Sequence, residues 1–133
     1  MDTDDSSSIV TLSDADKQYF GASIRHFENG IEYYVAREVC EYLGYTKWTA
    51  FLTVLNRARK VLQDASVHFR PVDKLTPTPN GLVRSIDDYW LSREAFLLIV
   101  MNADGYLPMV ARGKGYIAES VIKAQEAEKA RSN

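Results

Sequence analysis

Apolar residues recur at helical spacing on both sides of a glycine in the first half of the chain. Over residues 36–43 they fall at i, i+3, i+4 and i+7, which places them on one face of a short helix. Gly44 then stands where a helix ends on a left-handed residue, and Thr46 is a candidate N-cap for a second helix. The pattern over residues 36–63 therefore predicts two helices joined by a tight turn, the second of them the longer.

The second predicted helix has one apolar face and one polar face. At about 100° per residue, its apolar positions gather on one side: Trp48, Phe51, Leu52, Leu55, Ala58 and Leu62. The other side carries hydroxyl groups, an amide and cations, from Thr49, Thr53, Asn56, Arg57 and Lys60. Such groups hydrogen-bond phosphates and base edges. Two interpretations stay open, an ordinary solvated face or the DNA-reading helix of a helix-turn-helix.

Two Asn-Gly pairs, each between runs rich in β-branched and aromatic residues, predict two β-hairpins. Asn29-Gly30 precedes a predicted strand over residues 31–35, and both residue types tolerate the positive φ of a two-residue turn. Asn80-Gly81 marks the second hairpin, in which Pro71 restricts the first strand to a sheet edge or a loop. A hairpin after two helices is the layout of a winged helix, whose Arg84 would contact a phosphate or a minor groove. Alternatively the hairpin only covers the core, and Arg84 is a surface cation.

The second half of the chain is predicted to be helical. Ser92 is a candidate N-cap before the apolar run 95–101, which we assign to a helix and not a strand. Pro108 suits the first turn of a last helix. This helix ends in a charged, Ala-rich tail, either a solvated extension or a helix–helix contact of a homodimer. The predicted fold is α+β and winged-helix-like, with two β-hairpins packed with about four helices in one domain over residues 17–133, after a flexible acidic head.

Charge is distributed unevenly along the chain. The net charge of the 133 residues is −2, but residues 37–70 hold six Lys and Arg against three Asp and Glu, and the acidic head occupies residues 1–16. A locally basic face is what phosphate contact requires. Cys40 lies on a predicted buried face. Because it is the one cysteine of the chain, an intrachain disulfide is excluded, which fits a reducing cytosol. Because no apolar run is long enough to cross a membrane, we expect a soluble cytoplasmic protein.

The sequence carries no pattern for catalysis, a cofactor or a metal. His26 and His68 fall in different predicted hairpins, and with a single cysteine no zinc pattern can be built. Neither common type of glycine-rich phosphate loop occurs, and no Gly-x-Ser-x-Gly elbow. Asp87 and Asp88 are neighbours, so on a strand they point to opposite faces and do not share a metal. We therefore expect no enzyme and no cofactor.

Short motifs in order resemble the N-terminal domain of the DNA-damage-inducible protein D family. They include Ala36-Arg37-Glu38, Leu43-Gly44-Tyr45, Leu91-Ser92-Arg93-Glu94-Ala95 and Met101-Asn102-Ala103-Asp104. The chain is also similar, more distantly, to the Bro N-terminal domain of phage antirepressors and large DNA viruses. The resemblance spans about residues 27–118, and it implies a bacterial or phage regulator with a non-catalytic, winged-helix-like module that binds DNA or another regulator.

We predict a cytoplasmic DNA-binding regulatory module of a DNA-damage response or of a phage or mobile element. Its predicted contacts to double- or single-stranded DNA are Lys47, Thr49, Thr53, Asn56, Arg57, Lys60 and Arg84. Arg59 is left out, because its angle puts it beside Trp48, where it covers an aromatic ring or pairs with a carboxylate. The alternative is a protein-binding inhibitor or antirepressor that acts on a host repressor, repair or defence protein. The DNA-binding prediction requires Thr53, Arg57 and Lys60 to be exposed on one face.

Overall fold

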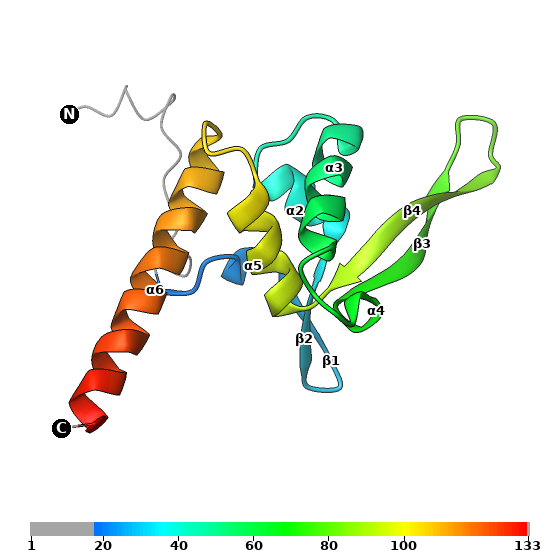
Figure 1. Cartoon of the computed structure of the whole chain (residues 1–133). Coiled ribbons are helices and arrows are strands. Elements are labelled where there is room, and N and C mark those ends of the chain that lie inside the picture. Colours follow the sequence, from blue (N-terminus) through cyan, green and yellow to red (C-terminus); the bar gives the residue numbers. More distant parts are fainter. Residues whose placement is uncertain (1–17, 133) are drawn as a thin grey trace, which may run out of the picture.

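The computed structural model describes residues 18–132, which form an antiparallel four-stranded sheet and five α-helices (Figure 1). The strands are β1 (Arg25–Glu28), β2 (Ile31–Val35), β3 (Phe69–Pro77) and β4 (Val83–Leu91). The helices are α2 (Ala36–Tyr42), α3 (Trp48–Arg59), α4 (Ala65–His68), α5 (Arg93–Asn102) and α6 (Pro108–Ser132), with a 3-10 turn, η2 (Ala22–Ile24), before β1. The α+β class with two hairpins is confirmed, and there is one helix more than expected. The predicted acidic head, residues 1–16, lies outside the described residues.

Both hairpins turn at the Asn-Gly pairs that predicted them. In the first turn the φ angles of Asn29 and Gly30 are 53° and 78°, the positive values that these residue types tolerate. In the second hairpin the pairing of β3 with β4 starts at Phe69↔Leu91 beside the core. β4 also pairs with β2, so the strand order is β1-β2-β4-β3. β3, which contains Pro71, is an edge strand, as a proline in a sheet requires.

The predicted helix, turn and helix are present, although their ends differ from the prediction. α2 buries the predicted apolar face, and Gly44 adopts the left-handed conformation with a φ of 95°. α3 begins one residue later than expected: its N-cap residue is Lys47, whose side chain makes no capping hydrogen bond, so the prediction of Thr46 as N-cap is wrong. α3 ends at Arg59 because the chain turns there toward α4.

α4 is a helical turn that the sequence did not predict. The β-like residues after Ser66 suggested a strand or loop, but residues 65–68 are helical and the strand begins at Phe69. His68 ends this turn, and its Nδ1 lies 2.7 Å from Oγ of Ser92 at the start of α5. His68 is therefore a half-buried helical residue and not the hairpin residue predicted, because a contact with a residue far along the chain holds it there.

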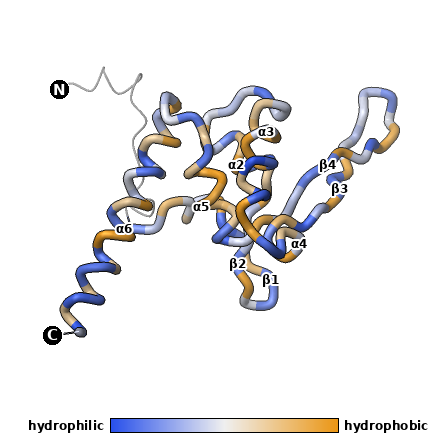
Figure 2. Tube along the Cα trace, viewed as in Figure 1, coloured by the Kyte–Doolittle hydropathy of each residue, from blue (hydrophilic) through white to orange (hydrophobic). Residues whose placement is uncertain are grey.

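α5 is the central helix, with α6 on one side and α2 and α3 on the other (Figure 1). Its N-cap is Ser92, whose side chain accepts a hydrogen bond from the backbone N–H of Ala95, as predicted. The ring of Phe96 stacks on Tyr34 of β2 at 4.4 Å and on Phe20 at 5.9 Å between centroids. Figure 2 shows apolar residues along most of α5. A helix can be apolar on most of its sides when neighbouring elements cover it on several sides, as they cover α5.

Candidate nucleic-acid interface

The outer face of α3 is exposed, as the DNA-binding prediction requires. The exposed side chains are Lys47, Thr49, Thr53, Arg57 and Lys60, and Asn56 is half-buried. The opposite face buries Phe51, Val54, Leu55 and Ala58 in the core. From residue 47 to residue 60 the helix carries cations and no acidic residue. The two faces predicted from the hydrophobic spacing are thus the two faces of the folded helix.

Two residues on this face also make contacts within the protein. Nη1 of Arg57 donates a hydrogen bond of 3.3 Å to the carbonyl oxygen of Asn102, the last residue of α5. The hydroxyl of Thr53 donates to the carbonyl oxygen of Thr49 at 3.1 Å. Each keeps capacity for a second partner, because a guanidinium has five donors and a hydroxyl also accepts. These contacts orient the two side chains without removing them from the surface.

Asn56 is held more firmly, by Arg59. The Oδ1 of Asn56 accepts a hydrogen bond from Nη2 of Arg59, whose guanidinium carbon lies 5.3 Å from the ring centroid of Tyr89 on β4. Arg59 covers an aromatic ring as predicted, but that ring is Tyr89 and not the neighbouring Trp48, which lies under Arg37. The acceptor oxygen of Asn56 is therefore engaged within the fold, and its two amide N–H groups remain as donors.

The β3–β4 hairpin extends away from the body on the side of α2 and α3 (Figure 1). Arg84 is exposed and pairs with Thr76, and the next pair on the same face is Lys74↔Ile86. Cross-strand partners, and residues two apart on a strand, share a face of the sheet. Lys74, Thr76 and Ile86 line a hollow together with residues of α2 and the start of α3. Arg84 and Lys74 thus lie on the hairpin face that looks toward the N-terminus of α3.

The hollow between the hairpin and the helices has a volume of about 380 Å³. On its helix side the guanidinium of Arg37 lies 4.1 Å from the ring centroid of Trp48, and its Nε donates to the carbonyl oxygen of Asp87 at 2.8 Å. Lys74 stands on the hairpin side, and Glu41 contributes one carboxylate. Arg37 and Lys74 were missed as site residues, because they come together only through the position of the folded hairpin relative to α2.

Asp88 fixes the base of the hairpin to α2. Its side chain is 3% exposed, and Oδ1 accepts hydrogen bonds from the backbone N–H of Arg37 at 3.1 Å and of Tyr89 at 2.8 Å. A carboxylate at the first turn of a helix satisfies a free amide and complements the helix dipole. Asp87 is exposed, so the two aspartates point apart as predicted. The hairpin is therefore oriented by a contact at its base.

The described residues offer little for covalent or metal chemistry. Cys40 is buried, and burial raises the pKa of its thiol, which disfavours the reactive thiolate. Among residues 18–132, no three His, Cys, Asp or Glu side chains lie close enough together to hold a metal ion. In the same part of the chain, no helix has both the length and the apolar character needed to cross a bilayer.

Folding raises the pKa of four groups, in each case chiefly by burial: Cys40, Tyr19, Tyr34 and Tyr45. The folded state therefore holds these protons more tightly than the unfolded state, whose ordinary pKa values are 9.0 for the thiol and 10.0 for the tyrosines. Their stabilisation is complete below those values and is lost as pH rises. We expect the thermal midpoint to fall between about pH 9 and pH 11, and calorimetry across that range measures it. A midpoint that stays constant would contradict this expectation.

Comparison with known proteins identifies relatives of the chain. Residues 23–122 match the family described as "BRO family, N-terminal domain". The chain is similar to DNA damage-inducible protein D of Escherichia coli (strain K12), with 32% identity over 94 residues that cover 68% of this chain and 34% of that protein. The chain thus spans about a third of the length of that relative. No solved structure matches the chain.

Proposed function

The chain belongs to the BRO family of N-terminal domains, and from that premise we propose that it is a non-catalytic, winged-helix-like module that binds DNA. α3 enters the major groove, and the β3–β4 hairpin acts as the wing. The observation that carries the proposal is the exposed, cation-bearing outer face of α3, on a helix beside which a hairpin with Lys74 and Arg84 projects from the body (Figure 1). The chain order supports it too: α2, α3 and the single turn of α4 precede the hairpin, and β4 pairs with the strand before those helices, β2.

The charge of the proposed interface is positive although the net charge of the chain is −2. Lys47, Arg57 and Lys60 on α3 and Arg84 on the hairpin contact phosphates, which gives most of the affinity and makes it dependent on salt. Thr49, Thr53 and Asn56 face base edges in the major groove, which has room for one α-helix. The regulatory role, in a DNA-damage response or in a phage or mobile element, rests on the similarity to DNA damage-inducible protein D.

A triple variant tests the phosphate contacts. Within the described part of the chain, the side chains of Lys47, Lys60 and Arg84 make no hydrogen bond or ion pair. We therefore expect Lys47→Gln, Lys60→Gln and Arg84→Gln together to leave the fold intact. We expect the slope of log K against log salt to become shallower by about 2 to 3, with at least a tenfold loss of affinity near physiological salt. Fluorescence anisotropy with a duplex of about 30 bp at several salt concentrations measures both quantities.

A matched control removes the same charge elsewhere. Lys123→Gln, Lys129→Gln and Arg131→Gln lie on the exposed end of α6, so we expect little change in affinity or slope. If the α3 and hairpin variant keeps the slope of the unmodified chain, these residues are not the DNA-binding surface.

A second function is favoured by the far end of the hairpin. Leu75, Leu82 and Val83 are 66–70% exposed there, and apolar residues gathered on a projecting element are typical of a protein-binding surface. The corresponding function is an inhibitor or antirepressor that binds a host repressor, repair or defence protein. Mobility shifts at low salt distinguish the two: no shift with duplex or single-stranded DNA, together with a protein partner that is lost on Leu82→Ser, favours the second.

A further inference from the structure

The hollow between the β3–β4 hairpin and the start of α3 contains two cations whose capacity for hydrogen bonds is largely unused. Within the described chain, only Nε of the Arg37 guanidinium makes a hydrogen bond, to the carbonyl oxygen of Asp87. The side chain of Lys74 is exposed and makes no hydrogen bond or ion pair in the same part of the chain. Among the side chains that line the hollow, Glu41 has the one carboxylate, and it pairs with neither cation. The hollow therefore keeps a net positive charge and free hydrogen-bond donors.

Arg37 is held in one orientation by contacts within the fold. Its guanidinium carbon lies 4.1 Å from the ring centroid of Trp48, and its backbone N–H donates to the carboxylate of Asp88 at the base of the hairpin. A side chain that is already fixed loses little freedom when it binds a ligand. The planar guanidinium also matches two oxygens of a phosphate, through the terminal amino groups that remain free. An anion in the hollow therefore meets donors that are already oriented.

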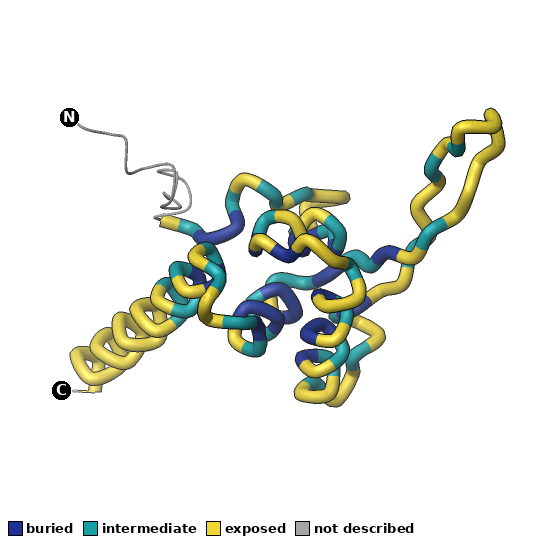
Figure 3. Tube along the Cα trace, turned by 90° about the horizontal axis from the view of Figure 1, so that it is seen from above, coloured by how far each residue is buried: buried dark blue, intermediate teal, exposed yellow. Residues whose placement is uncertain are grey.

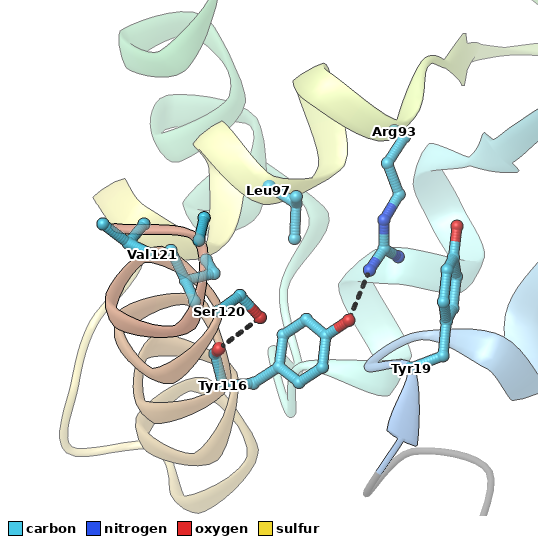
Figure 4. A pocket seen from close by; sticks show the side chains of 8 residues that line it. Tyr19, Arg93, Leu97, Tyr116, Ser120 and Val121 are labelled. Atoms are coloured by element: carbon cyan, nitrogen blue, oxygen red, sulfur yellow. Dashed lines mark hydrogen bonds between the residues drawn. The ribbon is translucent and has the colours of Figure 1, made fainter. Parts of the chain in front are cut away.

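A second hollow, where α6 leaves the body, contains an arginine whose donors are engaged within the fold (Figure 4). Nη1 of Arg93 donates to the carbonyl oxygen of Phe20 and to the hydroxyl of Tyr34, each at 2.7 Å. Nη2 lies 3.4 Å from the hydroxyl of Tyr116, and the guanidinium carbon lies 3.9 Å from the ring centroid of Tyr19. Arg93 is thus a structural residue. Of these two hollows, only the one at the hairpin presents unengaged cations to a ligand.

The hollow at the hairpin borders the exposed face of α3. Two of its lining residues, Thr46 and Trp48, stand at the N-terminal end of α3, where no side chain caps the helix and the free amides favour an anion. At about 100° per residue, Thr49 and Asn56 on the exposed face lie about 100° and 80° from Trp48 around the helix axis. On the other side of the hollow, most of the hairpin beyond its base is exposed (Figure 3). A ligand on the exposed face of α3 therefore has the hollow at its edge.

We propose that this hollow is a phosphate-binding site, in which Arg37 and Lys74 hold one backbone phosphate of DNA that runs along the boundary between α3 and the hairpin. The inference rests on the DNA binding proposed above and adds a site to it. Arg37 donates through its two terminal amino groups to two phosphate oxygens, and the ammonium of Lys74 neutralises the phosphate from the hairpin side. Because Arg37 is already oriented, this contact fixes the position of the protein along the DNA backbone.

Removal of the two cations tests the site. We expect Arg37→Gln with Lys74→Gln to make the slope of log K against log salt shallower by about 2, and to weaken duplex binding about tenfold near physiological salt. Lys74→Gln alone should give about half of the change in slope. It changes a side chain without contacts in the described chain, so it tests the site even if the loss of Arg37 disturbs the base of the hairpin. The control, Lys123→Gln with Lys129→Gln on the exposed end of α6, should change neither quantity.

Glu41→Gln tests the same site in the opposite direction. Removal of the carboxylate from the hollow should tighten duplex binding about threefold, and a gain of affinity does not arise from damaged folding. Glu28→Gln removes the same charge at the exposed end of β1, outside the hollow, and should have little effect. An equal response to both variants would contradict a phosphate site in the hollow.

The remaining outcomes separate this site from the proposed function. If the hollow variants keep the affinity and slope of the unmodified chain while Lys47→Gln, Lys60→Gln and Arg84→Gln together lose them, DNA binding stands and the hollow is not a phosphate site. If both sets keep them, both proposals fail. The volume of about 380 Å³ also admits a small molecule, so ATP is titrated by calorimetry. Micromolar binding of ATP that Lys74→Gln abolishes, with duplex binding unchanged, would assign the hollow to a free nucleotide and overturn the proposal.

Discussion

Arg93→Ala lowers the free energy of unfolding by about 3 kcal/mol. The side chain, on the first turn of α5, joins segments that lie far apart in the sequence: the carbonyl oxygen of Phe20, the hydroxyl of Tyr34 on β2 and the ring of Tyr19. Tyr34 and Phe20 are fully buried. Truncation leaves two acceptors without their donor, and each such loss costs about 1–3 kcal/mol. Urea unfolding followed by circular dichroism measures the change.

Two variants show whether geometry or charge is responsible for that loss. Arg84→Ala removes the same charge from the exposed hairpin and should change stability by less than about 0.5 kcal/mol. Arg93→Lys should recover only part of the loss, because an ammonium has no planar fork to bridge both acceptors and stack on Tyr19. Equal losses for Arg93→Ala and Arg84→Ala would show that the contacts around Arg93 do not hold the fold together.

Gly113→Leu has a comparable effect, for a steric reason. A Cβ at Gly113 would lie 2.8 Å from Phe20 Cε2, Phe20 Cζ and Val100 Cγ1, so α6 approaches the core this closely only without a side chain there. Leucine is the better helix former by about 0.7 kcal/mol, but overpacking a buried contact costs more than that. We expect a net loss of about 3 kcal/mol, measured by thermal and urea unfolding.

The other glycine of this helix is the natural control for that variant. Gly115 is also inside α6, and a Cβ there would meet no atom within 4 Å. Gly115→Leu should therefore stabilise the protein by roughly the difference in helix propensity, about 0.7 kcal/mol. If both variants stabilised the protein, helix propensity, and not the close approach of α6 to the core, would govern this segment.

The sequence predicted only the part of the candidate interface that lies on a single helix, α3. The spacing of Phe51, Leu55 and Ala58 determines which side of α3 is buried, and the exposed side follows from it. Arg37 and Lys74 were not predicted, because they meet across a hollow formed by α2, α3 and the hairpin. Their proximity depends on the pairing of β3 with β4 and on the bond from Asp88 to the start of α2.

The sequence by itself determined the features that arise between near neighbours in the chain. Asn29-Gly30 turns a hairpin because both residues accept a positive φ, and Ser92 starts α5 because its hydroxyl reaches an amide three residues later. The tertiary structure alone decided α4, the start of α3 and the role of Arg93. His68 is held by Ser92, and Arg93 donates to Phe20, 73 positions away. Such partners are brought together by packing, and the spacing of residues along the chain carries no signal for them.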